Sequence, residues 1–389
     1  MSRTEYECIV LGLGAIGSGA AYWLSRRAGA AVLGLEQFEL GHERGESEDH
    51  SRIIRLSYHT PHYVELAKLA YDAWDGLESE AGERVVLVTG GVDLAPAGAA
   101  IPIDSYTASM RAAGVPFEML DADEIMRRWA PFRLTSDVIG LFQERSGIAM
   151  ASRANAAHRR MALEHGATLR ANAPVTAIVA GDGEVTVVAG GVTYRTGTLV
   201  IAAGPWTNGA LGHLGIALPL EVTQEQVTYF DSPRRADFAP DRFPIWIWMD
   251  DPCFYGFPVF GENGPKVAQD AGGKPVTAET RTFEPDPENF ARVEAFVRTH
   301  LPTALGPVIR TTTCLYTLTP DRDFVVGAVP EHENVFVAVG AGHAFKFSSQ
   351  LGRILSELAL DGRTGIDLAP FAIDRAVMTM ANPPRHYMT

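Results

Sequence analysis

The chain has 389 residues, a formal net charge of −14 at pH 7 and three cysteines. This length exceeds what one compact core usually reaches, so we expect two domains that share an interface. The acidic charge argues against nucleic acid or an anionic membrane surface as a partner. The three scattered cysteines cannot form a disulfide framework, which indicates a reducing compartment.

No apolar run reaches the ~20 residues that a membrane-spanning helix needs. The stretch MSRTEYECIVLGLG lacks the basic segment, the apolar stretch and the cleavage site of a secretory signal. Together with the cysteine content, these features predict a cytoplasmic protein without a membrane partner.

A strand, a glycine-rich turn and a helix are predicted near the N-terminus. Residues 8–11 form a short apolar run that suits a strand buried on both faces. Gly12, Gly14 and Gly17 follow in the pattern G-x-G-x-x-G. The first glycine permits the turn, the second lets the backbone approach a pyrophosphate, and the third lets the helix pack closely on the strand. The phosphates would bind at the N-terminus of the helix.

The next predicted strand, residues 31–35, ends in Glu36. A carboxylate at this distance from the glycines can hold ribose hydroxyls, although an exposed charge at a strand end is the alternative. The order of these elements predicts a dinucleotide cofactor and leaves NAD and FAD open. A buried strand at 197–207 and a strand, turn and helix at 334–362 favour FAD, because a helix N-terminus there could stabilise a reduced flavin.

Arg52 and Arg55 are three residues apart, so they would share a face in a helical turn and point to opposite faces in a strand. Arginine is suited to bidentate recognition of a carboxylate. The alternative is a set of salt bridges to the nearby acids Glu46, Glu48 and Asp49. The residue types alone favour neither interpretation.

Two lysines and one cysteine remain ambiguous from the residues alone. Lys346 opens the predicted C-terminal helix, where a cation opposes the helix dipole and needs an anionic partner or exposure. A substrate carboxylate would be such a partner. Lys266 reads as an ordinary surface lysine by its spacing, and Cys314 reads as a small buried residue.

The sequence resembles the monomeric sarcosine oxidase family, which includes N-methyltryptophan oxidase and pipecolate oxidase, along essentially its whole length. The stretches that carry the resemblance are GLGAIGSGAAYWL, SRIIR, YGFPVFG, CLYTLTPDRDFVVG and GHAFKFSS, in that order. The resemblance implies an α/β fold in which a Rossmann-like FAD-binding domain is interleaved with a mixed-sheet α+β substrate domain. It implies residues 1–85, 140–220 and 314–389 for the first domain and residues 86–139 and 221–313 for the second.

The resemblance also implies roles for single residues. Cys314 matches the cysteine that is joined through its sulfur to the 8α-methyl group of FAD. Arg52 matches the arginine beside the flavin, whereas Arg55 and Lys346 match the residues that bind the substrate carboxylate. Lys266 matches the lysine near flavin N5, where a cation stabilises the superoxide formed from O2.

Tyr255 and Tyr316 match aromatic residues near the substrate, with simple core packing as the alternative for each. The candidate cofactor contacts are Gly12, Gly14, Gly17, Glu36, Arg52, Val175, Cys314, Gly342 and Lys346. The family's sarcosine oxidases carry a histidine four positions after the N5 lysine, where this chain has Asp270. That acid could pair with a substrate amine or with an internal arginine, and it puts sarcosine in doubt as the substrate.

The resemblance implies flavin-dependent oxidation of the secondary amine of an N-methyl or cyclic amino acid, with an imine and hydrogen peroxide as products. The expected partners are a small amino acid and O2, and the expected state is a monomer. A dehydrogenase with another electron acceptor is the first alternative, and a flavin-binding protein without turnover is the second. An NAD-dependent dehydrogenase is the least favoured.

Overall fold

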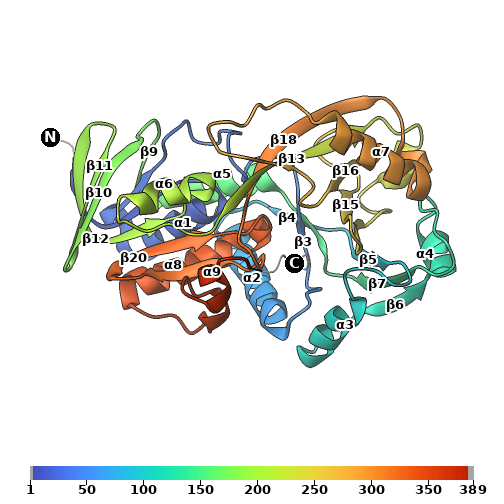
Figure 1. Ribbon diagram of the computed structural model, residues 1–389, viewed down its shortest axis with the longest axis horizontal. Helices are drawn as coiled ribbons and strands as arrows, with labels where there is room; N and C mark the ends of the chain where they lie inside the picture. The colour runs from blue at the N-terminus through green and yellow to red at the C-terminus, as the bar shows by residue number, and fades with distance from the viewer. Residues whose placement is uncertain (1–2, 384–389) are drawn as a thin grey trace.

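The computed structural model describes residues 3–383, which form two large sheets and one small sheet. Figure 1 shows the eight-stranded sheet and its helices on the left and the nine-stranded sheet on the right. The C-terminal part of the chain, in red, returns to the N-terminal part, in blue. Segments far apart in the sequence therefore build one half of the molecule.

Parallel strands in the order β9, β2, β1, β12 and β20 form the centre of the eight-stranded sheet. Strand β19 pairs antiparallel with β20, and β10 and β11 extend β12 as an antiparallel meander. The strands are β1 (Glu5–Leu11), β2 (Val32–Leu35), β9 (Thr168–Arg170), β10 (Val175–Gly181), β11 (Glu184–Ala189), β12 (Val192–Ile201), β19 (Val325–Val329) and β20 (His332–Val339). The continuous burial of β2 and of the end of β1 is typical of a parallel sheet covered on both faces.

Four helices pack in one apolar core with this sheet, namely α1 (Ala15–Ala28), α2 (Pro61–Ala81), α5 (Ala151–Glu164) and α8 (Ser348–Asp361). Helix α2 begins where the Thr60 side chain accepts a hydrogen bond from the Tyr63 N–H, and it ends at Gly82 with φ +67°. Helices α1 and α8 approach closely through glycine, because a Cβ at Gly352 would lie 2.3 Å from the Gly19 carbonyl carbon.

The nine-stranded sheet is mixed. Its order is β17, β13, β16, β15, β14, β5, β7 and β6, with β18 paired to β13 on the side opposite β16. The strands are β5 (Gly91–Ala95), β6 (Glu118–Asp121), β7 (Ile139–Gln143), β13 (Glu221–Phe230), β14 (Ile245–Trp248), β15 (Phe254–Phe257), β16 (Lys266–Gln269), β17 (Lys274–Val276) and β18 (Val308–Leu318). Aromatic residues of β14 and β15 stack on Phe296 of α7 (Pro287–His300), which gives this sheet its own core.

Strands β3 (Arg52–Ile54), β8 (Gly147–Ala149) and β4 (Val86–Val88) form the small sheet. The remaining helices are α3 (Ile103–Ala112), α4 (Ala122–Arg128), α6 (Thr207–Gly212) and α9 (Ala376–Thr379). The 3-10 turns are η1 (Gly29–Ala31), η2 (Gly204–Trp206), η3 (Arg235–Phe238), η4 (Pro302–Ala304), η5 (Ala344–Phe347) and η6 (Ala369–Phe371).

The predicted α/β class is confirmed, with a Rossmann-like parallel sheet beside a mixed sheet. The predicted domain limits at 140 and 314 each cut a strand. Strand β7 (Ile139–Gln143) pairs along its length with β5, and β18 continues past Cys314 to pair Leu318 with Glu221. The pairing runs on both sides of each predicted limit, so both strands belong entirely to the nine-stranded sheet.

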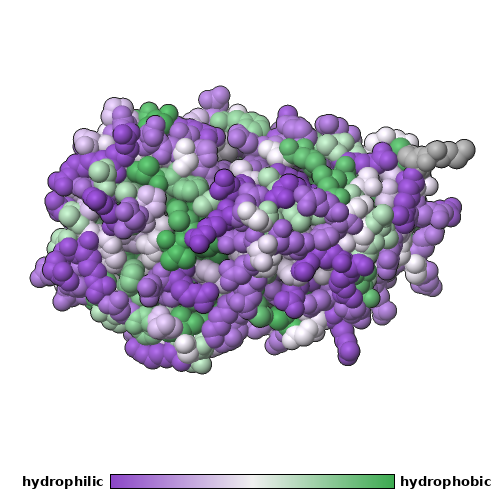
Figure 2. Space-filling view, turned by 180° about the vertical axis from the view of Figure 1, so that it is seen from behind, coloured by the Kyte–Doolittle hydropathy of each residue, from purple (hydrophilic) through white to green (hydrophobic). Residues whose placement is uncertain are grey.

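Hydrophilic residues dominate the face of the molecule in Figure 2, and apolar residues form small scattered groups on it. No helix among residues 3–383 is long and apolar enough to cross a bilayer. The sequence also predicts a non-helical end around Pro383 and Pro384, and the part from residue 384 onward lies outside the described residues.

Candidate active site

A cavity of about 380 Å³ is lined by residues of both large sheets and of the loop between β2 and β3. This volume lies in the range of small-molecule and cofactor sites. Nearly all of the residues singled out from the sequence line the cavity, namely Gly12, Gly14, Glu36, Arg52, Arg55, Val175, Tyr255, Lys266, Asp270, Cys314, Tyr316, Gly342 and Lys346. Gly17 is the exception, because it packs beneath the turn instead of facing the cavity.

The glycine turn leaves no room for side chains. Gly12 has φ +87°, and a Cβ there would lie 2.5 Å from the Ala202 carbonyl oxygen. A Cβ at Gly17 would lie 1.8 Å from the Gly12 carbonyl oxygen, so α1 packs directly against the turn. Both positions fit the predicted roles of a tight turn and close packing, and they form a cradle of the kind that a pyrophosphate needs.

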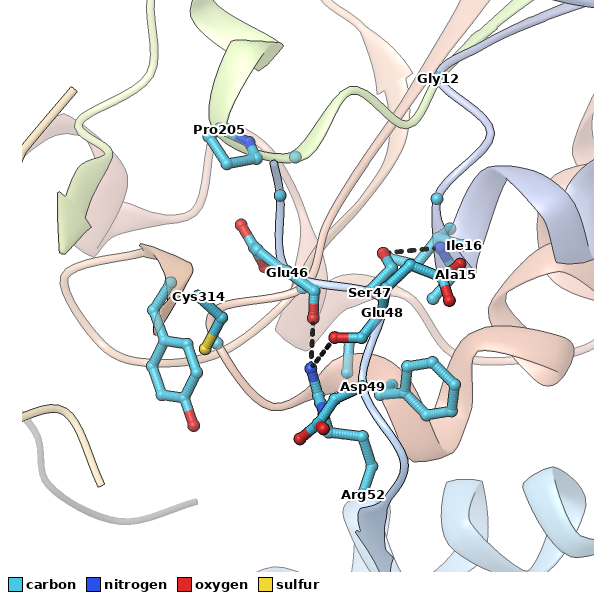
Figure 3. Close-up of a pocket in the computed structure, with 18 of the residues that line it drawn as sticks. Gly12, Ala15, Ile16, Glu46, Ser47, Glu48, Asp49, Arg52, Pro205 and Cys314 are labelled. Carbon is cyan, nitrogen blue, oxygen red and sulfur yellow. Dashed lines mark hydrogen bonds and ion pairs between the residues drawn. The ribbon is translucent and has the colours of Figure 1, made fainter. Parts of the chain in front are cut away.

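The space above Gly14 contains a side chain that the sequence analysis did not identify. A Cβ at Gly14 would lie 2.7 Å from Ser47 Oγ, and that oxygen accepts a hydrogen bond of 2.9 Å from the Ala15 N–H. Figure 3 shows Ser47 beside the first turn of α1. The loop before β3 therefore supplies a hydroxyl to the helix N-terminus, where a phosphate oxygen would also bind.

Glu36 is only 5% exposed at the end of β2, so it is not the exposed strand-end charge that was the alternative. Its carboxylate accepts hydrogen bonds from the Leu13 N–H at 2.9 Å and the Phe38 N–H at 3.2 Å, and His42 Nε2 lies 3.3 Å away. Burial alone would raise the pKa of Glu36, but the bonds from His42 and the two backbone groups hold it below its usual value. The cavity wall thus contains an ionised carboxylate where the sequence predicts contact with a ribose.

Arg52 extends from β3 toward the loop that precedes it. Its guanidinium lies 3.2 Å from Asp49 Oδ2 and donates to the backbone oxygens of Glu46 at 2.8 Å and Glu48 at 3.2 Å. Figure 3 shows these two backbone contacts. The salt-bridge interpretation is therefore correct for Asp49, whereas Glu46 and Glu48 contribute carbonyl oxygens.

Lys266 is 2% exposed on β16, so the interpretation as a surface lysine by spacing is wrong. Its ammonium donates to Asp49 Oδ2 at 2.8 Å and to the Ser51 carbonyl oxygen at 2.9 Å, and it lies 4.4 Å from the centroid of the Phe257 ring. Burial lowers the pKa of Lys266 to about 8, and the charge of Asp49 opposes that effect.

Cys314 and Tyr316 are two residues apart on β18 and both line the cavity. The Tyr316 and Tyr255 hydroxyls are 3.5 Å apart, so neither tyrosine is only a packing residue of a closed core. Burial raises the pKa of the Cys314 thiol to about 12, and the charge of Arg52 acts in the opposite direction. The protein therefore places its guanidinium where it would favour the thiolate.

Arg55 and Lys346 both line the cavity, and they lie 4.9 Å and 5.9 Å from the centroid of the Tyr58 ring. Arg55 is 3% exposed and lies 3.4 Å from the carboxylate of Asp93, a partner on β5 that the sequence analysis missed. A lone acid in the otherwise apolar strand GVDLA is the signal that could have identified it. Lys346 lies in η5, just before α8, and its carbonyl oxygen accepts a hydrogen bond of 2.7 Å from Trp74 Nε1.

Lys346 is 9% exposed. Its ammonium forms no ion pair with a carboxylate among residues 3–383, since the nearby acids Asp93 and Asp270 pair with other cations. Burial, followed by the charge of Arg55, lowers the pKa of Lys346 to about 7. Asp270 forms an ion pair of 3.2 Å with Arg322, which the sequence analysis also missed. Of the two partners expected for Asp270, the structure therefore contains the internal arginine.

A parallel sheet with a glycine turn, a buried acidic strand end and a cavity that continues to a second sheet define a dinucleotide-dependent oxidoreductase. The chain belongs to the FAD dependent oxidoreductase family, whose model matches residues 7–358. This assignment confirms FAD, and not NAD, as the cofactor.

The chain is 38% identical over 387 residues to the monomeric sarcosine oxidase of Streptomyces avermitilis, which covers 95% of this chain and 97% of that protein. It is 31% identical over 377 residues to the N-methyl-L-tryptophan oxidase of Salmonella arizonae, with coverages of 95% and 99%. Among solved structures, the open form of NikD, an unusual amino acid oxidase essential for nikkomycin biosynthesis, has a TM-score of 0.84 and 29% identity, covering 99% of this chain and 100% of that one.

Proposed function

We propose that the protein oxidises the secondary amine of an N-methyl or cyclic amino acid to an imine and transfers the electrons to O2, giving hydrogen peroxide. The observation that carries this proposal is Lys346, a buried ammonium at the cavity wall without an acidic partner among the described residues. A buried cation is costly unless it is paired, and a substrate carboxylate would pair it. The relatives named for sarcosine and N-methyl-L-tryptophan oxidation point to the same class of substrate.

The charges around Lys346 favour a substrate with one negative charge. The cations are Arg55, Lys346 and Arg322, and the acids paired with two of them are Asp93 and Asp270. Three cations and two carboxylates leave one excess positive charge. Burial raises the pKa of Asp93 although Arg55 opposes this, and protonation of Asp93 would increase the excess. An amino acid with an ionised carboxylate and a neutral amine balances this charge.

In this mechanism, bound FAD supplies the two-electron acceptor. Lys346 binds the substrate carboxylate. Burial lowers the pKa of Lys346, and the negative charge of the bound carboxylate raises it again, so that the lysine is protonated in the complex. Arg55, anchored by Asp93, adds a second positive charge on the same side. These two contacts fix the orientation of the carbon–nitrogen bond, which is the main source of catalysis that the chain itself provides. Tyr255 and Tyr316 line the cavity beside that position and restrict the shape of the amine.

The proposal is tested with the purified flavoprotein in the absence of air. N-methyl amino acids and cyclic imino acids should bleach the flavin absorption, and matched amines without a carboxylate should not. Admission of air should then release one hydrogen peroxide per amine oxidised. If no secondary amino acid bleaches the flavin, the proposal is wrong. Bleaching without peroxide would support the alternative dehydrogenase, against which the buried Lys266 ammonium argues.

We also propose that Cys314 holds FAD through a thioether. The cysteine faces the cavity from β18, and the Arg52 charge acts on its thiol. The thiolate is the reactive form of cysteine, so a neighbouring cation assists the attachment.

The first prediction concerns this bond. Denatured wild-type protein should keep its yellow colour through a desalting column, whereas denatured Cys314→Ala should lose it because no sulfur remains to hold the flavin. Cys253→Ala is the matched control, because Cys253 also lines the cavity and should leave the flavin attached. Colourless denatured wild-type protein would contradict the thioether and leave the oxidase proposal intact.

A further inference from the structure

Asp49 contacts two cations of the cavity wall, Lys266 and Arg52, although the sequence analysis considered it only as a possible salt-bridge partner of the arginines. Its Oδ2 accepts from Lys266 at 2.8 Å and from Arg52 at 3.2 Å, and its Oδ1 accepts from the Tyr229 hydroxyl at 3.1 Å and the His50 N–H at 2.7 Å. The side chain of Asp49 is 6% exposed. It is therefore a fully satisfied buried carboxylate between two cations that both line the cavity.

The backbone of Asp49 is fixed as well. Its carbonyl oxygen accepts hydrogen bonds from the Ser152 N–H at 3.0 Å and from Ser152 Oγ at 2.9 Å, at the start of α5. Its own N–H donates to Ser152 Oγ at 3.3 Å. The carboxylate thus has a defined position, independent of the side chains that it contacts.

We propose that Asp49 is the positioning residue of Lys266, which it holds in the protonated form against the cavity wall. Arginine keeps its proton at any pH that proteins tolerate, so Lys266 is the member of this cluster whose charge can vary. The titratable and charged groups that face Lys266 or its partner are Asp49, Arg52, Tyr229, Cys314, His50 and Arg310. Within this set, Asp49 is the residue that is ionised and negative at neutral pH.

The effect of Asp49 is to determine where a positive charge lies. With Asp49 present, the Arg52 and Lys266 charges exceed it by one. If Asp49 is replaced by asparagine, burial and Arg52 both act to remove the proton from Lys266, so the protonated fraction of Lys266 falls while Arg52 keeps its charge. At the same pH, the wild type therefore keeps a larger share of protonated Lys266 on β16 than Asp49→Asn does. The protonation rests on this geometry, whereas its value for the reaction with O2 rests on the proposed function.

Lysine titration measures this inference directly, because the chain contains four lysines: Lys68, Lys266, Lys274 and Lys346. The holoprotein labelled with 13C at lysine Cε would give four signals, and Lys266→Met identifies the signal of interest. In Asp49→Asn, the midpoint of Lys266 should fall by at least one pH unit, a tenfold lower ratio of protonated to neutral lysine. A midpoint that is unchanged or higher would overturn the inference.

Two controls separate the effect from loss of structure. The signal of Lys346 should keep its midpoint in Asp49→Asn, because Asp49 is not among the groups that shift its pKa. Glu262→Gln removes a carboxylate that pairs with His50 and Arg310 in the same region, and it should leave the Lys266 midpoint within a few tenths of a pH unit. If Glu262→Gln lowers that midpoint as much as Asp49→Asn does, the specific role of Asp49 is wrong.

Reoxidation of the reduced holoprotein by O2 then tests the functional consequence. In the wild type, the rate should fall as pH rises through about 8, where Lys266 loses its proton. In Asp49→Asn, the same fall should occur at the lower midpoint found by titration. A rate that does not change with pH near either midpoint would show that Lys266 has no role in the oxygen step, and that part of the proposed function would be wrong. The result on the protonation of Lys266 would be unaffected.

Discussion

Two lysines in the cavity wall act through their charge state. Lys266 has a carboxylate at 2.8 Å, and burial lowers its pKa to about 8. Lys346 has no acidic partner among the described residues, and burial lowers its pKa to about 7. The lysine with the partner keeps its proton to higher pH, as linkage between charge and environment requires. The protein thus contains one lysine whose charge is paired with a carboxylate, Lys266, and one that can pair with the anionic group of a ligand, Lys346.

The second prediction concerns binding of a carboxylate to Lys346. Lys346→Met should weaken binding of a carboxylate inhibitor without an amine by roughly 1.5–3 kcal/mol, the usual worth of a charged hydrogen bond. In the wild type, affinity should be constant at low pH and fall as pH rises through about 7, because the ammonium of the ligand-free protein is lost there. The change in flavin absorption on titration with the inhibitor measures both effects.

In Lys346→Met, the dependence of affinity on pH near 7 should disappear. Lys274→Met is the control, since the Lys274 side chain is 63% exposed at the edge strand β17 and should not change binding. An affinity that stays constant between pH 6 and 9 in the wild type would contradict the role of Lys346.

Local and distant features differ in how well the sequence predicts them. Gly12 is predictable because the turn itself requires its φ of +87°, and Gly17 because its nearest neighbour, Gly12, lies only five positions earlier. The pairing of Lys266 with Asp49 joins residues 217 positions apart, and that of Arg55 with Asp93 joins residues 38 apart. No spacing rule relates such residues, so a lysine in a short buried strand reads as an exposed one.

At the scale of elements, the contact between α1 and α8 fixes the turn that carries Lys346. Gly19 and Gly352 face each other, and a Cβ on Gly19 would lie 2.6 Å from the Ser348 carbonyl oxygen at the start of α8. Helices this close cannot accept a methyl group without a backbone shift. The position of η5, directly before α8, depends on that contact.

The third prediction concerns this helix contact and uses two alanine substitutions in helices. Gly352→Ala should destabilise the protein by roughly 1–3 kcal/mol, as overpacking against backbone does. Gly76→Ala in α2 has nothing within 4 Å of the new Cβ, so it should stabilise the helix by roughly 0.5–1 kcal/mol. Urea unfolding of both variants measures the difference. Equal effects of the same sign would show that the α1–α8 approach is not tight.

At the scale of the whole molecule, we propose that FAD links two units, each built on one large sheet. The units are interleaved, because the chain crosses between the sheets several times, as β5 to β7 and β13 to β18 show. The family resemblance implies this interleaving, but it places the crossings at 140 and 314, inside strands that the hydrogen bonding assigns to the nine-stranded sheet. Motifs mark contacts with the cofactor, whereas crossings follow the pairing of strands.

Thermal unfolding of Cys314→Ala without bound flavin tests the link. Added FAD should raise the unfolding temperature with the logarithm of its concentration, with ~2.7 kcal/mol of stabilisation at one hundred times its dissociation constant. ADP would contact only the part of the cavity near Gly12 and Glu36, so it should bind more weakly and stabilise the protein less at the same concentration. If ADP and FAD are equally effective, the cofactor does not link the two sheets.

The burial of two of the four lysines has a practical consequence for attachment to solid supports. Reagents that acylate side-chain amines would react at Lys274, which is 63% exposed, and at Lys68, which is 34% exposed on α2. Neither residue lines the cavity. Coupling through lysine side chains to an activated electrode would therefore attach the protein at Lys68 or Lys274 and leave the residues of the cavity unmodified.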